Sequence, residues 1–323
     1  MAILPPLRFG PIVREYLWGG RRLGTELGKA IGDSTRAAES WEVVDHGADQ
    51  SVVAAGPLVG ETLHQLVMQS GAALLGRHDP RPRFPLLFKF LDCQQTLSVQ
   101  VHPNDAQAAR LDPPDLGKTE AWIILAAEPG SKVYAGLKPG VDRPALEREL
   151  ARGKCDVCLH EFEPRVGDCL LIQAGTVHAL GAGLLIAEIQ QASDTTYRLF
   201  DWNRVDRDGR PRELHIQQAL GTIDFARGPV DPIKPMATDT PGVTRLAACD
   251  KFILDRRTLE TPHSLPRDDR FHILAVVEGV VDVRSDVGIQ SLHRGDTLLI
   301  PAATRGVEIV GQGRASVLDM YLP

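Results

Sequence analysis

The sequence predicts a mainly β protein in which one barrel unit is used twice and a few short helices are inserted. Its apolar runs are short, and 30 glycines and 23 prolines supply turn signals between them. Many short strands at close spacing are typical of a sandwich or a barrel. The predicted strands lie at 86–91, 98–101, 121–127, 131–137, 168–172, 183–190, 196–200, 272–277, 280–285 and 297–301.

Helical patterns are few in this sequence. In the clearest one, Asp142 is placed to cap the start, Pro144 falls in the first turn and Gly153 marks the stop. We interpret the helices as insertions on a β scaffold. The candidate helices are residues 61–75, 104–111, 142–151 and 213–220.

Internal similarity supports the repeated unit. Residues 167–180 resemble residues 295–308 when Gly167 is set against Gly295. Self-similarity of this kind indicates one structural unit used twice. Between the two copies, residues 227–243 are rich in Pro, Gly and Thr and show little periodicity, which is typical of a linker.

The differences between the copies indicate where the chemistry lies. His178 falls opposite Gly306, and a second pair of similar segments sets Glu120 opposite Arg270. The first copy therefore carries candidate metal ligands that the second copy lacks. We predict a catalytic metal-binding domain with helical insertions at 1–235 and a degenerate domain without metal ligands at 236–323.

Composition excludes several classes of partner. The net charge is −6 and the pI is about 5.9, which argues against nucleic acid or an anionic membrane as the main partner. No stretch approaches the roughly 20 apolar residues that a membrane span needs. An odd number of cysteines, five, favours reduced thiols, and the N-terminus shows no export signal. We therefore expect a cytoplasmic protein, as a monomer or a homodimer.

Four residues form the candidate metal site: Gln100, His102, Glu120 and His178. Residues 97–102 alternate apolar and polar, so Gln100 and His102 share one face of a strand that ends at Pro103. Glu120 opens the next predicted strand, and His178 follows a glycine turn. The sequence 167–178 resembles the second cupin motif, and Gln100-x-His102 followed by Glu120 resembles the first. A cupin jelly-roll barrel brings both motifs to one end of its interior.

This set of imidazole, carboxylate and amide ligands suits zinc, which accepts nitrogen and oxygen donors and needs an open position for catalysis. A neutral Gln100 in place of a third histidine leaves the metal a stronger Lewis acid. Each residue alone is more often a surface or hydrogen-bonded group. The joint pattern, with the glycine spacing and the degenerate second copy, favours one metal site per chain.

Much of the chain resembles type I mannose-6-phosphate isomerase (phosphomannose isomerase) of the short bacterial form, in the cupin superfamily. The order of the matching stretches is more specific than any one of them. The longer members have a large helical insertion, whereas only residues 103–119 separate His102 from Glu120 here. The matching stretches are WGG (18–20), AESWE (38–42), LLFKFLD (86–92), LSVQVHPND (97–105), GKTEAW (117–122), AGTVHAL (174–180) and EIQQASDTTYRLFDWNR (188–204).

The resemblance implies zinc-dependent interconversion of mannose 6-phosphate and fructose 6-phosphate through a cis-enediol. It also implies that the four candidate residues hold the zinc and that Arg198 is catalytic. Glu39, Lys89, Lys118 and Glu188 match further active-site positions of the family.

The residues themselves leave some of these roles open. Glu188 lies on a predicted strand, where a carboxylate pointing into a barrel has a raised pKa suited to a general base, unless it orients a ligand or Arg198. Lys118 is placed either to transfer a proton or to hold the sugar phosphate. Lys89 needs a buried partner, which a substrate phosphate or Glu39 would supply. The alternative for Arg198 is a salt bridge to Asp194 or Asp201.

Two other functions fit the same fold. Two histidines and a carboxylate are also the ligands of non-haem iron oxygenases. A non-catalytic sugar-binding cupin is the second alternative. The complete ligand set, Arg198 and the two lysines favour the isomerase over both.

Overall fold

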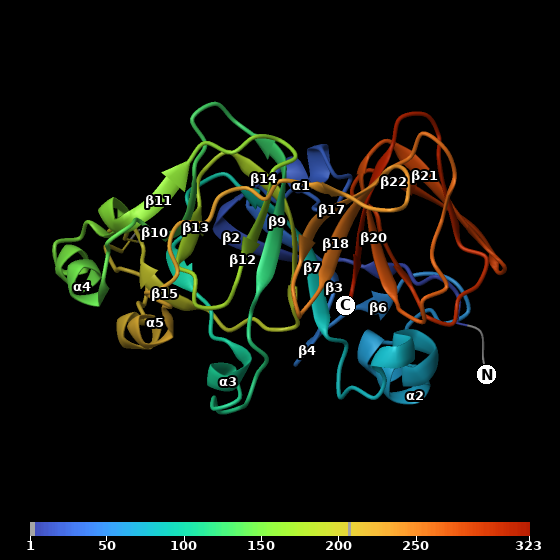
Figure 1. The fold of residues 1–323 in the computed structure, drawn as a ribbon, viewed down its shortest axis with the longest axis horizontal. Helices are drawn as coiled ribbons and strands as arrows, with labels where there is room; N and C mark the ends of the chain where they lie inside the picture. The colour runs from blue at the N-terminus through green and yellow to red at the C-terminus, as the bar shows by residue number, and fades with distance from the viewer. Residues whose placement is uncertain (1–3, 206–207) are drawn as a thin grey trace.

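The computed structural model describes residues 4–205 and 208–323, and its chain forms two β-barrels side by side (Figure 1). All strand pairs are antiparallel within the described residues. The first barrel contains a six-stranded sheet of order β12-β9-β14-β7-β3-β2. Its strands are β12 (Cys169–Ile172), β9 (Glu120–Ala127), β14 (Leu184–Gln191), β7 (Leu86–Cys93), β3 (Ala37–Val43) and β2 (Ile12–Gly20).

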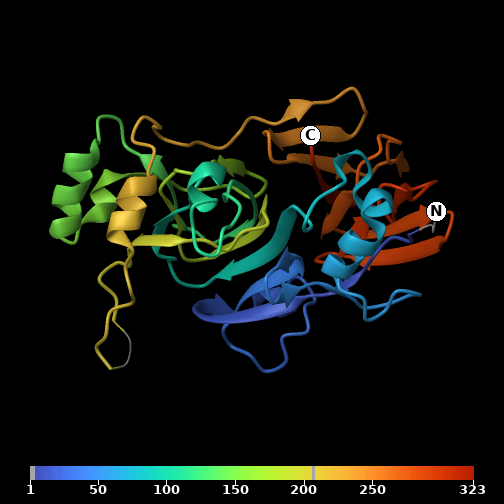
Figure 2. The same cartoon turned by 90° about the horizontal axis from the view of Figure 1, so that it is seen from below.

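A five-stranded sheet of order β11-β10-β13-β8-β15 completes the first barrel. Figure 2 shows the strands of this barrel as a ring beside the rest of the chain. The strands are β11 (Leu159–Phe162), β10 (Val133–Leu137), β13 (His178–Leu180), β8 (Val99–Val101) and β15 (Tyr197–Phe200).

The second barrel repeats this plan with a six-stranded sheet of order β16-β17-β18-β25-β20-β23 and a four-stranded sheet of order β19-β24-β21-β22. The first sheet consists of β16 (Met236–Ala237), β17 (Val243–Ala248), β18 (Ile253–Thr258), β25 (Ser316–Tyr321), β20 (His272–Glu278) and β23 (Thr297–Ile300). The second consists of β19 (His263–Ser264), β24 (Glu308–Gly311), β21 (Val280–Ser285) and β22 (Gly288–His293).

The remaining elements are short. Two small ribbons pair β1 (Phe9–Gly10) with β6 (Val52–Val53) and β4 (Asp45–His46) with β5 (Asp49–Gln50). No described helix is both long and apolar enough to cross a membrane. The helices are α1 (Arg22–Thr25), α2 (Leu63–Leu75), η1 (Gly76–His78), α3 (Asp105–Ala108), α4 (Arg143–Ala151), η2 (Cys155–Cys158) and α5 (Ile216–Thr222).

The predicted mainly β class is confirmed, and so are the four helical regions. Asp142 caps α4 by accepting a hydrogen bond from the backbone N–H of Ala145. Gly153 follows the end of this helix with a φ of 68°, a backbone conformation that glycine adopts without strain. The strands β2 and β3, which the sequence patterns did not predict, extend the first sheet. All five cysteines are free thiols.

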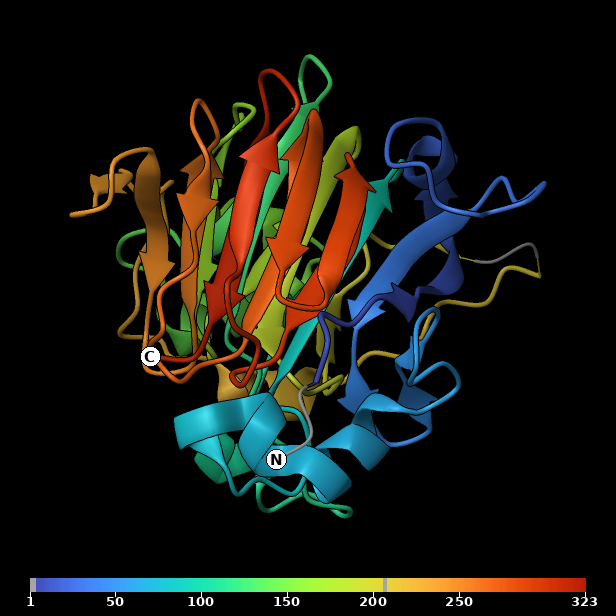
Figure 3. The same ribbon diagram turned by 90° about the vertical axis from the view of Figure 1, so that its right-hand side faces the viewer.

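The two six-stranded sheets pack face to face, and the largest apolar core lies between them (Figure 3). In β9, Ala121 and Ile123 face this shared core, whereas Trp122 and Ile124 face the interior of the first barrel. Successive residues of a strand point to opposite faces, so both faces of β9 and β14 are buried. This explains the continuous apolar run of β14, every residue of which is buried.

The ladders of the two barrels correspond residue by residue. Ile172 pairs with Glu120, and Ile300 pairs with His272. When the two copies are aligned on Gly167 and Gly295, Ile172 aligns with Ile300. Glu120 therefore corresponds to His272, and the expected position opposite Arg270 is wrong by two residues.

A difference in hairpin length caused that error. The connection between β9 and β10 spans residues 128–132, whereas Gly279 alone separates β20 from β21. Matching the acidic residues at these hairpins shifts the alignment of the strands before them. In the register that the strand pairs show, Lys118 of the first barrel corresponds to Arg270 of the second, and Glu188 corresponds to Asp319.

Candidate metal centre and active site

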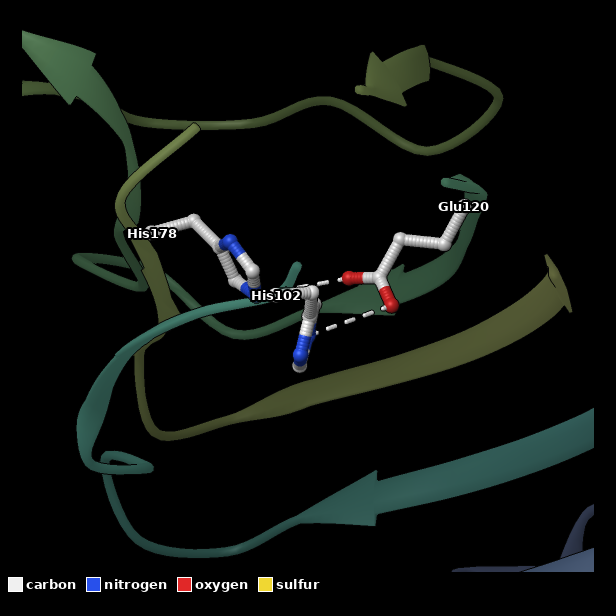
Figure 4. Close-up of side chains that lie close together, drawn as sticks. All are labelled: His102, Glu120 and His178. Carbon is white, nitrogen blue, oxygen red and sulfur yellow. Dashed lines mark ion pairs between the residues drawn. The ribbon is translucent and has the colours of Figure 1, made fainter. Parts of the chain in front are cut away.

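Three buried side chains converge inside the first barrel: His102, Glu120 and His178 (Figure 4). His102 directly follows β8, Glu120 opens β9 and His178 opens β13. The Nε2 atom of His102 lies 3.5 Å from one carboxylate oxygen of Glu120, and Nε2 of His178 lies 3.3 Å from the other. One atom from each residue lies within 4.8 Å of the other two, and this is the one such group within the described ranges.

Backbone carbonyls orient both imidazole rings. Nδ1 of His102 lies 3.0 Å from the carbonyl oxygen of Thr195, and Nδ1 of His178 lies 2.9 Å from that of Thr176. A carbonyl only accepts hydrogen bonds, so each Nδ1 carries the proton and donates it. Each Nε2 is then left with a free lone pair close to Glu120, and in His102 this nitrogen also lies 3.1 Å from the Lys118 ammonium. A second hydrogen bond of this kind is typical of metal-ligating histidines.

Burial keeps both rings neutral. It lowers the pKa of His178 to about 4, and the pKa of His102 lies well below its usual value because of burial and the nearby Lys118 ammonium. Nε2 of His178 is buried and has no hydrogen-bond partner. An unsatisfied buried nitrogen costs stability unless a ligand uses its lone pair.

The spacing of these donors fits a metal ion. Tetrahedral coordination with metal–ligand bonds of about 2.1 Å places the donor atoms about 3.4 Å apart. The distances from the two histidines to Glu120, 3.5 Å to one carboxylate oxygen and 3.3 Å to the other, are of this size. His102, Glu120 and His178 therefore form a candidate site for a transition-metal ion.

Lys118 adds a buried cation beside the triad. Its Nζ donates to Glu120 and lies 3.1 Å from Nε2 of His102. The same ammonium lies 3.7 Å from Glu188. Lys118 thus lies between two buried carboxylates.

A second group of charges adjoins the first. Lys89 lies 3.4 Å from Glu188 and 3.3 Å from Glu39, and Trp41 donates its indole N–H to Glu39 over 2.6 Å. The partner expected for Lys89 is therefore present in Glu39. Burial raises the pKa of Glu188 against the lowering effect of Lys89. Burial alone would lower the pKa of Lys89, but Glu188 and Glu39 outweigh it and raise it.

Gln100 and Arg198 lie beside the triad on neighbouring strands. Gln100 pairs with His178 across β8 and β13, and with Arg198 across β8 and β15. Residues paired in this way point to the same face of the sheet. The alternative for Arg198, a salt bridge with Asp194 or Asp201, is not found among the described residues. Its guanidinium instead donates to the carbonyl of Glu213 over 2.8 Å.

Most of these side chains line one cavity of about 220 Å³. Arg198 lines it with a buried Nε that has no hydrogen-bond partner, and burial lowers the pKa of its guanidinium. Sequence patterns did not point to Arg212 or Tyr16, which also line the cavity, because each comes from a loop or an irregular strand. The predicted residues that line it are Glu39, Lys89, Gln100, Lys118, Glu120, Glu188 and Arg198.

Two family models match the chain. The model "Phosphomannose isomerase type I, catalytic domain" matches residues 7–122, and "Mannose-6-phosphate isomerase, cupin domain" matches residues 242–318. The chain is 35% identical over 302 residues to mannose-6-phosphate isomerase ManA of Bacillus subtilis, covering 92% of this chain and 93% of that protein. It is 31% identical over 308 residues to mannose-6-phosphate isomerase of Streptococcus mutans, covering 95% of each.

Solved structures agree with these matches. The crystal structure of mannose 6-phosphate isomerase from Bacillus subtilis superposes with a TM-score of 0.90 at 28% identity, covering 98% of this chain and 99% of that one. A structure of mannose 6-phosphate isomerase bound with zinc and yttrium shares the fold, with a TM-score of 0.77 at 17% identity over 99% and 100% of the chains. With a sequence relationship that spans both barrels, this chain belongs to the type I phosphomannose isomerase family.

Proposed function

We propose that this mannose-6-phosphate isomerase forms fructose 6-phosphate through a cis-enediol, with one zinc ion held by Gln100, His102, Glu120 and His178. The observation that supports this most directly is the buried triad, in which both unprotonated Nε2 atoms lie within 3.5 Å of the Glu120 carboxylate. Gln100 joins the set because it pairs with His178 on the same face. Zinc is also named in the solved structure of the same fold.

The reaction moves one proton, which leaves C2 of the aldose and returns at C1 of the ketose. When bound, zinc supplies Lewis-acid stabilisation of the developing negative charge on the sugar oxygen. The oxygenase and the non-catalytic alternatives are set aside, because the chain belongs to the isomerase family.

Glu188 is our candidate for the base that takes the proton from C2. Its Oε1 is buried without a hydrogen-bond partner, and burial raises its pKa toward the range useful for a base. Lys118 lies between Glu188 and Glu120, where it can return a proton to a sugar oxygen. Both groups lie on the wall of the same cavity.

Arg198 and the second charged group would hold the substrate. The unpaired Nε of Arg198 is available to the enediolate oxygen or to the phosphate, and guanidinium stays protonated even when burial lowers its pKa. Lys89, held by Glu39, places a further cation on the cavity wall. These cations would bind the phosphate of a phosphorylated sugar.

We further propose the division into a catalytic domain at 1–235 and a degenerate domain at 236–323. It is supported by the triad lying wholly in the first part. Five free thiols support a reducing, cytoplasmic setting, and the chain would act as a monomer or a homodimer.

The test is a coupled assay of mannose 6-phosphate isomerisation. Chelation should abolish turnover and zinc should restore it. Arg198→Ala should lower kcat at least a hundredfold while bound zinc stays at one ion per chain, because Arg198 touches substrate rather than metal. Arg165→Ala, an exposed arginine of the same barrel, serves as the matched control with unchanged kcat. Turnover in metal-free protein would overturn the proposal.

A further inference from the structure

A second polar cavity, of about 440 Å³, lies at the end of the C-terminal barrel where β20 begins. This size falls in the range of small-molecule sites. The C-terminal end of α2 borders the same region, since the carbonyls of Ala73 and Leu74 accept hydrogen bonds from the backbone N–H groups of Ala303 and Ala302. The basic residues that line the cavity are Arg267, Arg270, His272, Arg284 and Arg305.

Three of these arginines have guanidinium groups with no hydrogen-bond acceptor among the described residues. Arg267 and Arg305 also lack an ion pair there. Arg270 has one weak ion pair, 3.5 Å from Asp268, and lies over the Tyr321 ring at 5.2 Å from its centre. Its Nε is buried and has no hydrogen-bond partner. Guanidinium forks left free around one cavity are suited to bidentate binding of a phosphate group.

The floor of the cavity is cationic as well. Nδ1 of His272 lies 2.7 Å from Asp319, and Arg257 lies 2.7 Å from the same carboxylate. Burial alone would lower the pKa of His272, but Asp319 and Asp268 outweigh it and raise the pKa to about 9. Asp319 and Asp268 hold His272 between them, so this histidine is a fixed cation of the cavity wall.

Among the residues that line the cavity, basic side chains outnumber carboxylates. Glu308 pairs with Arg284 over 3.2 Å, whereas Asp269 and Asp286 make no ion pair within the described ranges. Carboxylates beside guanidiniums suit a ligand that carries hydroxyl groups next to its phosphate. A sugar phosphate has both kinds of group.

The ladder register relates this cavity to the active site. Arg270 occupies the place of Lys118, and His272 occupies the place of Glu120. Both pairs line the corresponding cavity of their own barrel. The second barrel thus keeps a pocket at the position where the first barrel holds its substrate cavity.

We propose that the C-terminal barrel contains a second, non-catalytic binding site for the phosphate group of a small anion, with Arg267, Arg270 and Arg305 as its ligands. This site is separate from the metal centre and carries no chemistry. The hydroxyl-accepting carboxylates favour a sugar phosphate as its occupant.

Equilibrium dialysis of the zinc-loaded full chain with radiolabelled fructose 6-phosphate and, separately, inorganic phosphate tests this site. We expect two sugar phosphates per chain for the native protein and one for Arg267→Gln/Arg305→Gln, with unchanged KM for mannose 6-phosphate. Both arginines are exposed, so the exchange leaves the fold intact. Arg314→Gln, an exposed arginine of the same barrel outside the cavity, is the control and should keep two sites.

The two ligands distinguish the occupant. Binding of fructose 6-phosphate at the second site at least tenfold tighter than inorganic phosphate identifies a sugar phosphate, whereas equal affinities identify the phosphate group alone. Arg305→Glu, which reverses one charge, should weaken either ligand about tenfold or more. A single site in the native protein, or two sites that survive in both variants, would overturn the proposal.

Discussion

Glu188 and Asp319 occupy equivalent positions in the ladders of the two barrels, yet their surroundings differ. Both are buried. Burial raises the pKa of Glu188 against the lowering effect of Lys89 and Lys118, which lie 3.4 and 3.7 Å from its Oε1. Arg257 and His272 hold Asp319 and lower its pKa to about 2 against the effect of burial. The same position thus carries a carboxylate able to take a proton in one barrel and a locked structural anion in the other.

The largest expected effect concerns the metal site, which is the clearest difference between the two barrels. Glu120→Gln removes the one anionic ligand, so the protein should lose bound zinc and at least a thousandfold in kcat. Elemental analysis of dialysed protein and the coupled assay measure the two losses. His293→Gln, an exposed histidine of the second barrel, should change neither. Stoichiometric zinc in Glu120→Gln would contradict the assignment of the triad.

The equivalent carboxylates should respond in opposite ways. Glu188→Gln should lower kcat about a hundredfold or more, because it removes a base. It should cost less stability than Asp319→Asn, because Lys89 keeps Glu39 and Lys118 keeps Glu120 as ion-pair partners. Asp319→Asn should cost about 3–5 kcal/mol of unfolding free energy, because it leaves Arg257 and His272 without their anion, while kcat of the folded protein stays near native. Urea unfolding and steady-state kinetics on both variants measure this. Equal loss of activity in both would break the contrast.

The second barrel should add a pH-dependent contribution to stability. His272 has a pKa of about 9 when folded and an ordinary value of 6.5 when unfolded, so the folded chain holds this proton more tightly. The contribution, on the order of 2–3 kcal/mol at neutral pH, is full below pH 6.5 and is lost as the pH rises through 9.

His272→Gln provides the measurement. Its deficit in unfolding free energy relative to the native protein should be largest near pH 6 and should shrink toward pH 9.5. Since Asp319 titrates only at about 2, it stays charged across this window. A deficit that does not change with pH would mean that the charge of His272 contributes nothing.

The smallest expected effects come from the helix caps. Thr62 caps α2 and Asp142 caps α4, and each change to Ala should cost about 1 kcal/mol locally. The helix α2 buries five apolar side chains, including Leu63 and Leu74, in the core shared by the barrels, whereas α4 buries only Leu146. Thr62→Ala should therefore lower global stability, and Asp142→Ala should only speed amide hydrogen exchange in α4. Equal global losses would refute this difference.

Part of the fold was readable from local pattern. Short apolar runs between turn signals placed many of the strands. The resemblance to the two cupin motifs anticipated the convergence of His102, Glu120 and His178, because ligands at fixed positions of a barrel meet regardless of loop sequence. The predicted alignment of the second copy was wrong by two residues in the strand that contains His272. It matched an acidic residue in one hairpin with an acidic residue in the other, and the two hairpins differ in length. Arg212 and Tyr16 reach the substrate cavity from irregular segments, and no periodicity marks such residues.

The buried Lys89 has a partner that local sequence patterns could not predict. Its strand is apolar on both faces, and the sequence indicated that an inward lysine needs a partner. It did not show that Glu188, almost a hundred positions later, would be paired opposite it in the sheet. Long-range partners of this kind depend on strand order, which short patterns do not contain.

The alternation of β9 and β14 between two apolar regions has a consequence for how this chain can change. Residues that face the shared core hold the barrels together, while their immediate neighbours line the barrel interior. Substitutions on the face that lines the barrel interior can therefore change the chemistry of the site without weakening the packing between the two barrels. One barrel of the pair can therefore acquire a different ligand specificity while the sheet face that packs against the other barrel stays unchanged.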